Sequence, residues 1–208
     1  MTEAYPPRWL EWAREIQALS QTGLAYNKDD YNVQRYQRLM EIAAEIVQSH
    51  TGLPKDPLFE NFLAQPGYAT PKVDVRAAVI RGGKILLVQE RVDGRWAMPG
   101  GWADVGEIPS EMVEREVWEE SGFEVKTRKV IGVYDGNRKN PLEFYHAYKI
   151  VFLCEIIGGQ ARPSNETLAV DFFSFDDLPP LSWERTNEHH LAEVLAHLQN
   201  GNRPAAFD

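Results

Sequence analysis

Residues 115–120 read REVWEE, which places three glutamates and one arginine within six positions. On a helix, Glu119 and Glu120 lie three and four positions after Glu116, so all three carboxylates project from one side. Like charges at this spacing repel each other and weaken the helix unless something neutralises them. Carboxylate oxygens are the ligands that Mg²⁺ prefers, and Mg²⁺ shares its coordination shell with substrate phosphates. The cluster therefore predicts a divalent-metal site that acts on a phosphate-containing substrate.

These residues belong to a longer pattern that begins at Gly101 and ends at Phe123. Five residues separate Gly101 from Glu107, and seven separate Glu107 from Arg115. The stretch contains seven acidic residues and one basic residue, so most of the chain's net charge of −9 lies here. Because an arginine fork can hold a carboxylate with two hydrogen bonds, we expect Arg115 to reach both Glu107 and Glu119 and to orient the cluster. Taken alone, the cluster also fits a solvated helix face, but the complete pattern favours a metal site.

The pattern resembles the Nudix box at each of its fixed positions, which here are Gly101, Glu107, Arg115, Glu116, Glu119, Glu120 and Gly122. Nudix hydrolases share an α/β/α sandwich in which the box forms a loop, a helix and a second loop. The resemblance therefore implies an α/β (α+β) fold with a mixed sheet. It also implies a pyrophosphohydrolase that cleaves a nucleoside diphosphate linked to a moiety X into a nucleoside monophosphate and X-phosphate.

The same resemblance identifies candidate metal ligands. Glu116, Glu119 and Glu120 would hold Mg²⁺ or Mn²⁺, and the carbonyl group of Gly100 would be a further ligand. Bound cations would polarise the bridging phosphates and lower the pKa of a water molecule that attacks one phosphorus in line. Arg115 would support these catalytic residues.

The general base is indicated less sharply. Glu119 is our candidate, but family members differ in which glutamate takes the proton, so Glu116 and Glu120 stay open as alternatives. Glu166, which precedes a predicted strand outside the box, is a further candidate, and an exposed loop acid is the equal alternative. Arg76 and Arg95 are candidates for binding substrate phosphate, although each also fits an ordinary surface charge.

The first third of the chain has the periodicity of helices, with apolar residues at steps of three and four. The expected helices span residues 7–19, 29–49 and 57–63. In the first of them the apolar stripe contains Trp9, Trp12, Ile16 and Leu19. The stretch QPGYATP that follows has two prolines and a glycine, which is typical of a linker. We therefore predict a helical domain at 1–64, a linker at 65–71 and a Nudix domain at 72–208.

The rest of the chain combines strand and helix signals. The expected strands span residues 73–80, 84–90, 95–102, 124–134, 144–156 and 170–175. The Gly-Gly pair in RGGK predicts a hairpin between the first two. A helix at 110–121 would have Ser110 as its N-cap and Gly122 just past its end, and a last helix is expected at 186–199.

The N-terminal third carries a second resemblance. The stretch IQALSQTGLAY at 16–26 and the helices around it resemble a bacterial group of Nudix enzymes that acts on CDP-choline or ADP-ribose. The proline that is typical of ADP-ribose enzymes is displaced in this chain, at Pro141, so the base and X both stay open. The helices also hold more aromatic residues than a small core needs, which predicts a homodimer; these are Trp9, Trp12, Tyr31 and Tyr36.

Composition narrows the partners further. The chain is 43% hydrophobic and 25% charged, which is typical of a folded protein. Its net charge of −9 argues against DNA and disfavours long RNA contacts. No apolar stretch reaches the length of a membrane span or resembles a signal peptide, and the only cysteine is Cys154. We expect a cytoplasmic protein, with no membrane partner, that acts on a small nucleoside-diphosphate compound.

Two other functions remain alternatives at this point. One is a Nudix hydrolase that processes RNA ends, which would need a basic groove for the RNA. The other is a non-catalytic Nudix module that senses a ligand, against which the intact box argues.

Overall fold

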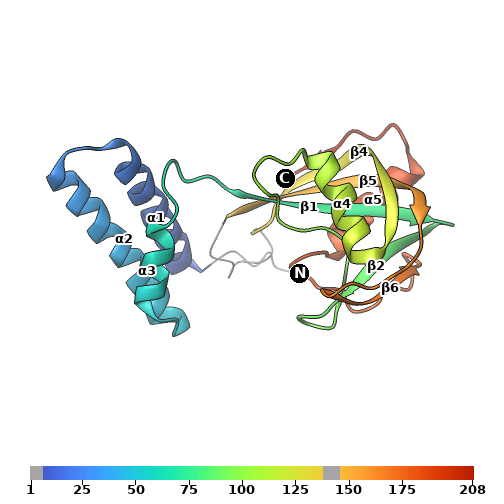
Figure 1. Ribbon diagram of the computed structural model, residues 1–208, viewed down its shortest axis with the longest axis horizontal. Coiled ribbons are helices and arrows are strands. Elements are labelled where there is room, and N and C mark those ends of the chain that lie inside the picture. Colours follow the sequence, from blue (N-terminus) through green and yellow to red (C-terminus); the bar gives the residue numbers. More distant parts are fainter. Residues whose placement is uncertain (1–6, 138–145) are drawn as a thin grey trace. The chain divides into compact units, whose positions relative to one another are not determined.

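The computed structural model describes residues 7–137 and 146–208 of the 208-residue chain. They form two compact units (Figure 1). The helical unit lies within the chain up to Pro71, and the sheet unit consists of residues 72–136 and 147–208. A helical region followed by a mixed sheet with helices is the predicted fold class, which is confirmed. Pro141 lies outside the described residues.

Three helices make up the helical unit: α1 (Arg8–Tyr26), α2 (Asp30–Thr51) and α3 (Lys55–Leu63). The carboxylate of Asp29 accepts a hydrogen bond from the backbone N–H of Asn32 at 2.9 Å and caps α2. The buried core of the unit consists of Met40, Ala43, Ala44 and Phe62.

The buried face of α1 differs from the apolar stripe in its sequence. Apart from Leu10, the buried residues of α1 are small or polar, namely Ala13, Gln17, Ser20 and Gln21. They allow α1 and α2 to approach closely, and a Cβ atom at Gly23 would lie only 2.4 Å from the Tyr36 ring. Trp12 and Leu19 consequently point outward, with 50% and 61% of their surface exposed. The helical unit thus presents apolar side chains at its surface.

The sheet unit contains seven strands and two helices within the described residues. These elements are β1 (Lys72–Arg81), β2 (Lys84–Glu90), β3 (Trp96–Ala97), α4 (Pro109–Ser121), β4 (Phe123–Asp135), β5 (Ala147–Gly159), β6 (Thr167–Phe173), α5 (Glu188–Gln199) and β7 (Ala206–Phe207). The strand order is β3-β2-β1-β5-β4-β7, and β6 pairs with β2. The sheet is mixed, because β1 runs parallel to β5 whereas β4 runs antiparallel to it.

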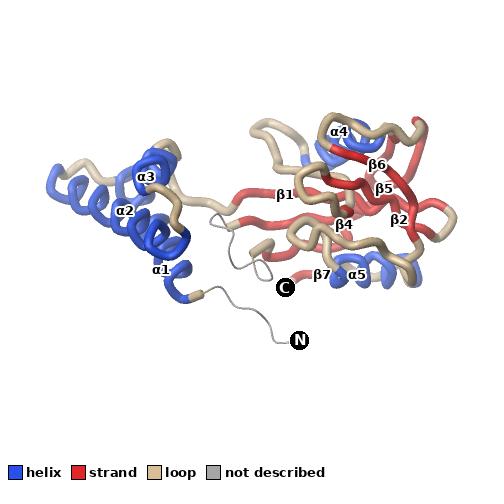
Figure 2. Tube along the Cα trace, turned by 90° about the horizontal axis from the view of Figure 1, so that it is seen from below, coloured by secondary structure: helices blue, strands red, loops and turns tan. Residues whose placement is uncertain are grey.

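The two helices of the sheet unit cover opposite faces of the sheet (Figure 2). Successive residues of a strand point to opposite faces, and β1 supplies both layers. Val75 and Val79 pack against α4, whereas Ala78 belongs to the cluster that includes Leu191 of α5. The resulting α/β/α sandwich agrees with the sequence-based expectation.

The strands β1 and β2 pair only at their hairpin end, through Ile80↔Ile85 and Arg81↔Lys84. Further along, the edge of β1 bonds instead to the segment at 99–103. The N–H of Ala77 donates to the Pro99 carbonyl at 2.8 Å, and the N–H of Val75 donates to the Gly101 carbonyl at 2.9 Å. The predicted strand at 95–102 is therefore wrong in length, because only Trp96–Ala97 pairs with β2.

Two helix starts also differ from expectation. Helix α4 begins at Pro109 with Ile108 as its N-cap, so Ser110 lies inside the first turn. Proline suits this position because its fixed φ is helical and its missing N–H would have no partner there. Helix α5 begins at Glu188, since the side chain of Asn187 accepts hydrogen bonds from the first N–H groups of the helix.

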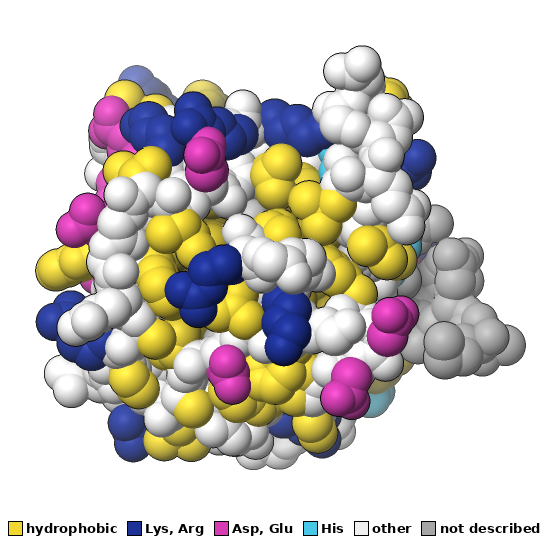
Figure 3. Space-filling view, turned by 90° about the vertical axis from the view of Figure 1, so that its right-hand side faces the viewer, with side chains coloured by type: hydrophobic (Ala, Val, Ile, Leu, Met, Phe, Trp, Pro, Cys, Tyr) yellow, Lys and Arg dark blue, Asp and Glu magenta, His cyan; other side chains and the backbone are white. Residues whose placement is uncertain are grey.

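The surface of the sheet unit mixes hydrophobic side chains with lysine and arginine on the face shown in Figure 3. In the sheet unit the guanidinium of Arg81 lies 3.9 Å from the ring centroid of Phe172, which is partly buried. Over the described ranges, no helix combines the length and apolar character that crossing a membrane requires.

Candidate active site

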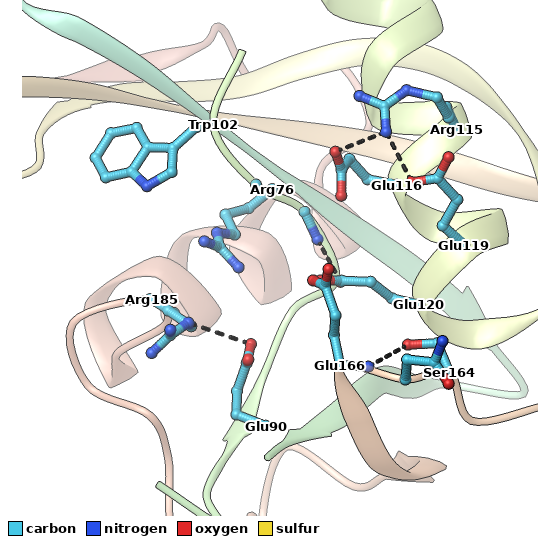
Figure 4. A pocket seen from close by; sticks show the side chains of 13 residues that line it. Arg76, Glu90, Trp102, Arg115, Glu116, Glu119, Glu120, Ser164, Glu166 and Arg185 are labelled. Atoms are coloured by element: carbon cyan, nitrogen blue, oxygen red, sulfur yellow. Dashed lines mark hydrogen bonds and ion pairs between the residues drawn. The ribbon is translucent and has the colours of Figure 1, made fainter. Parts of the chain in front are cut away.

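A pocket of about 470 Å³ lies beside α4 in the sheet unit (Figure 4). Its walls come from β1, β2, α4 and three connecting segments. The lining residues are Arg76, Glu90, Gly100, Gly101, Trp102, Arg115, Glu116, Glu119, Glu120, Ser164, Asn165, Glu166 and Arg185. Carboxylates and guanidinium groups dominate this set, so the pocket is built for charged groups.

Arg115 ties the preceding loop to helix α4. Its Nε and Nη2 atoms donate to the two oxygens of Glu107 at 2.8 and 2.9 Å. Its Nη1 atom donates to Glu119 at 2.7 Å and lies 3.0 Å from Glu116. The hydrogen bond from Arg115 lowers the pKa of Glu107, whose carboxylate therefore stays charged. The expected arginine fork is present, and the guanidinium of Arg115 contacts three carboxylates.

Glu120 and Glu90 are the most deeply buried carboxylates of the pocket, each with 6% of its surface exposed. Burial raises the pKa of Glu120 to about 8, although Arg76 and a hydrogen bond from the Gly100 N–H at 2.9 Å oppose the shift. Burial also raises the pKa of Glu116, against the opposing charge of Arg115. These carboxylates lack enough positive charge nearby to offset their loss of hydration.

Gly100 and Gly101 allow the loop to pass close to its neighbours. Gly100 has a φ of 144°, and a Cβ atom there would lie 2.0 Å from the carbonyl oxygen of Val75. A Cβ atom on Gly101 would lie 3.2 Å from a carboxylate oxygen of Glu116. Any side chain at position 100 would therefore displace the loop from β1.

A buried ion cluster fixes the guanidinium of Arg76. Its Nε and Nη2 atoms donate to Asp74 at 2.9 and 3.3 Å, and Nη1 donates to the Met98 carbonyl at 3.3 Å. Lys149 of β5 donates to the same carboxylate. Burial alone would raise the pKa of Asp74, but Arg76 and Lys149 outweigh it and lower that pKa. Arg76 is thus a charged, immobile group on the pocket wall.

Sequence reasoning missed two charged residues of the pocket. The Nε atom of Arg185 lies 3.3 Å from Oε1 of Glu90, and its Nη1 donates to Ser182. Within the described residues Glu90 Oε1 accepts no well-oriented hydrogen bond, so the contact with Arg185 is an ion pair of poor geometry. Burial raises the pKa of Glu90. Glu90 and Arg185 have no motif around them, and only the fold brings them together.

The pocket contains most of the residues that the sequence singled out. Glu166 lines it, and its backbone N–H donates to Ser164 (Figure 4). Arg95 does not line it: this residue lies in the exposed turn between β2 and β3, where its carbonyl accepts a hydrogen bond from the Glu90 N–H. The expectation that Arg95 reaches substrate phosphate is therefore not supported by its position.

The donor set of the pocket fits a hard divalent cation, since carboxylate oxygens predominate and three of the carboxylates, Glu90, Glu116 and Glu120, have raised pKa values. Over residues 7–137 and 146–208, no three acidic, histidine or cysteine side chains already stand at metal-coordinating spacing. The reason is local, because Glu119 turns to Arg115 while Glu120 turns to the Gly100 N–H. Glutamate side chains have several staggered rotamers, so these carboxylates can turn toward a bound cation.

Comparison with protein families assigns both units. Residues 70–198 match the model of the NUDIX domain, and residues 7–62 match a model described as a UDP-X-like, N-terminal oligomerisation domain. The chain is 37% identical to the putative ADP-ribose pyrophosphatase YjhB of Bacillus subtilis, over 97% of each protein.

Two solved structures extend the similarity. A UDP-X diphosphatase is 32% identical, with a TM-score of 0.63 over 96% of this chain and 98% of that one. An ADP-ribose pyrophosphatase from Streptococcus suis is 41% identical, with a TM-score of 0.62 over 67% of this chain and 100% of that one.

The buried ion cluster generates a prediction about stability. Replacing Asp74 by alanine leaves Arg76 and Lys149 buried without their shared carboxylate, which we expect to cost about 3–5 kcal/mol in the free energy of unfolding. Urea denaturation measures the change. The matched control is Glu155→Ala on β5, which removes an exposed partner of Arg128 and should cost less than about 1 kcal/mol. Equal losses in the two variants would contradict the role given to Asp74.

The raised pKa of Glu120 predicts a dependence of stability on pH. A carboxyl group with a pKa of about 8 in the folded protein, above its unfolded value, stabilises the fold at low pH and loses that contribution as pH rises through 8. In EDTA, Glu120→Gln should therefore gain stability relative to the native chain between pH 6 and pH 9, as read from urea midpoints. The control Glu111→Gln removes an exposed charge from the same helix. A parallel pH response of the two variants would refute the prediction.

Proposed function

The chain belongs to the Nudix hydrolase family, and we propose that it is a divalent-metal-dependent pyrophosphohydrolase of nucleoside diphosphates linked to a second moiety X. The products are a nucleoside monophosphate and X-phosphate. The names of the relatives described above suggest ADP-ribose and UDP-linked compounds as candidate substrates. CDP-choline is a further candidate, which only the resemblance of the N-terminal third to a bacterial Nudix group implies. The observation that carries the proposal is the single pocket in which the carboxylates of α4 and the fixed guanidinium of Arg76 meet.

In this proposal Glu116, Glu119, Glu120 and the Gly100 carbonyl would hold Mg²⁺ or Mn²⁺. When bound, the cations neutralise the diphosphate and lower the pKa of a water molecule. Arg115 keeps the carboxylates on one side of α4 through its contacts with Glu107 and Glu119. It acts as a positioning residue, because its guanidinium already has carboxylate partners on each side.

The remaining steps follow from the charges of the pocket. Arg76 binds a non-bridging phosphate oxygen without first having to be ordered, because Asp74 and the Met98 carbonyl hold its guanidinium. Water adds to one phosphorus, the bond from that phosphorus to the bridging oxygen breaks, and the bridging oxygen leaves with the electron pair. We assign the proton of the water to Glu119, whose side chain is 45% exposed and faces the pocket. Glu166, in the segment between β5 and β6, is the alternative base.

The net charge of −9 continues to disfavour long RNA as a substrate. The pocket walls are themselves mostly carboxylate on the α4 side, so a polyanionic strand would meet repulsion beyond its terminal phosphates. A small diphosphate compound therefore fits the charge distribution better than an RNA end does.

An activity panel tests the proposed function. We expect the purified full chain to release a nucleoside monophosphate from at least one of ADP-ribose, CDP-choline and UDP-glucose in Mg²⁺ or Mn²⁺, and EDTA should abolish the release. Glu119→Gln should lower kcat by about 10²–10⁴-fold, because it removes the proton acceptor and a metal ligand. Glu111→Gln on the exposed face of α4 is the control and should retain full activity. Absence of release from every diphosphate tested would reject the function, and a larger loss in Glu166→Gln would transfer the base to Glu166.

We further propose that the helical unit mediates a homodimer. Its match to an oligomerisation domain and its exposed apolar residues support this assembly, because such surface is usually covered by a partner. These exposed residues include Trp12, Leu19, Tyr26 and Tyr31.

If the chain is a homodimer, light scattering should give a molar mass of twice the chain mass of 23.7 kDa. Trp12→Glu should shift the protein toward monomer, since it buries a charge in the interface. Val92→Glu changes an exposed residue of the sheet unit and should leave the mass unchanged. A native chain that is monomeric at micromolar concentration would refute the homodimer.

A further inference from the structure

Trp102 is the only aromatic residue among those that line the pocket in the described part of the chain. The other lining residues are charged, small or polar. Trp102 has 51% of its surface exposed, although tryptophan normally loses most of its surface in a folded protein. Phosphate and metal chemistry does not account for a large apolar ring at this position, so the ring calls for a different kind of ligand group.

The backbone of Trp102 is held in place on both sides. The carbonyl of Gly101 accepts a hydrogen bond from the Val75 N–H at 2.9 Å, and the N–H of Ala103 donates to the Val73 carbonyl at 2.8 Å. Trp102 itself forms an isolated antiparallel bridge with Asp74 of β1. The indole therefore projects from backbone that the sheet already orders, and a ligand that contacts it orders little additional chain.

The pocket has a charged side and an apolar side, and Arg76 lies between them. In Figure 4, Arg76 lies between Trp102 on one side and the carboxylates of α4 on the other. Arg76 is fixed by Asp74 and the Met98 carbonyl. A diphosphate bound to Arg76 beside the carboxylates therefore has one attached group directed toward the indole.

We propose that Trp102 is the stacking platform for the nucleobase of the substrate. The inference rests on the proposed function only in taking a nucleoside diphosphate as the ligand. Among the parts of such a ligand the base has the large flat π surface that an indole stacks on, and stacking is insensitive to base identity because every base has a π-face. The pocket should thus require a base but discriminate weakly among adenine, cytosine and uracil.

Binding of the product nucleotides tests the platform without relying on hydrolysis. Isothermal titration calorimetry of the full chain in Mg²⁺ would use AMP, CMP and UMP, with ribose 5-phosphate as the ligand that lacks a base. Trp102→Ala should raise the Kd of all three nucleotides by about tenfold, as expected for loss of one base–aromatic stack, and should leave ribose 5-phosphate unchanged. Trp102→Phe should recover most of the nucleotide affinity, because it restores an aromatic face.

The control variant is Trp118→Ala, which removes a similarly exposed tryptophan of α4 that does not line the pocket. Its nucleotide affinities should equal those of the native chain. Equal weakening of ribose 5-phosphate, native affinity for nucleotides in Trp102→Ala, or no nucleotide binding by the native chain would each overturn the proposal. A selective loss of phosphocholine binding would also overturn it, because the indole would then hold X. If the chain bound nucleotides as expected but hydrolysed no diphosphate, the proposed enzyme activity would be rejected and the stacking role of Trp102 would stand.

Discussion

The hydrogen bond from the Gly100 N–H to the buried carboxylate of Glu120 joins two parts of the sheet unit that the chain supplies separately. Glu120 belongs to α4, whose apolar face is packed on the sheet through Val113 and Val117. Gly100 belongs to the loop that lies along the edge of β1. The contact therefore aligns the helix with the loop, and the close approach of the loop to the β1 backbone requires glycine at position 100.

The carboxylates of the pocket outnumber the guanidinium groups that could neutralise them. This excess of negative charge favours the binding of a cation. Arg115 serves three carboxylates, and Arg76 is already shared with Asp74. Glu120 consequently has a pKa near 8, held up by burial that its neighbours only partly offset. A folded protein tolerates such a group when the free energy lost in its burial is recovered on binding a cation or a ligand.

Sequence spacing predicted the parts of this pocket that a single helix controls. The steps from Arg115 to Glu119 and from Glu116 to Glu120 are fixed by helical geometry, so the carboxylate face followed from the residues alone. Glu90 and Arg185 lie far apart in the chain and meet only through β2 and the segment before α5, which no local pattern encodes. The sequence predicted surplus aromatic residues in the helical unit but not which face of α1 is buried. Helix α1 buries Ala13 and Ser20, and the choice of this face depends on the partner helix α2.

Because β1 and β2 diverge, the segment at 99–103 bonds to the free edge of β1, and its residues fall into two groups: those whose side chain is restricted and those whose side chain is not. The segment at 99–103 is attached to β1 by backbone hydrogen bonds, which do not depend on side-chain identity. Gly100 and Gly101 are restricted by the contacts that a Cβ atom would make there, whereas the side chains of Trp102 and Val105 are exposed. In evolution, therefore, the side chains that touch the ligand can be exchanged while the loop keeps its path and α4 keeps its carboxylates in place. Substrate preference in such a scaffold is free to diverge faster than the reaction that it catalyses.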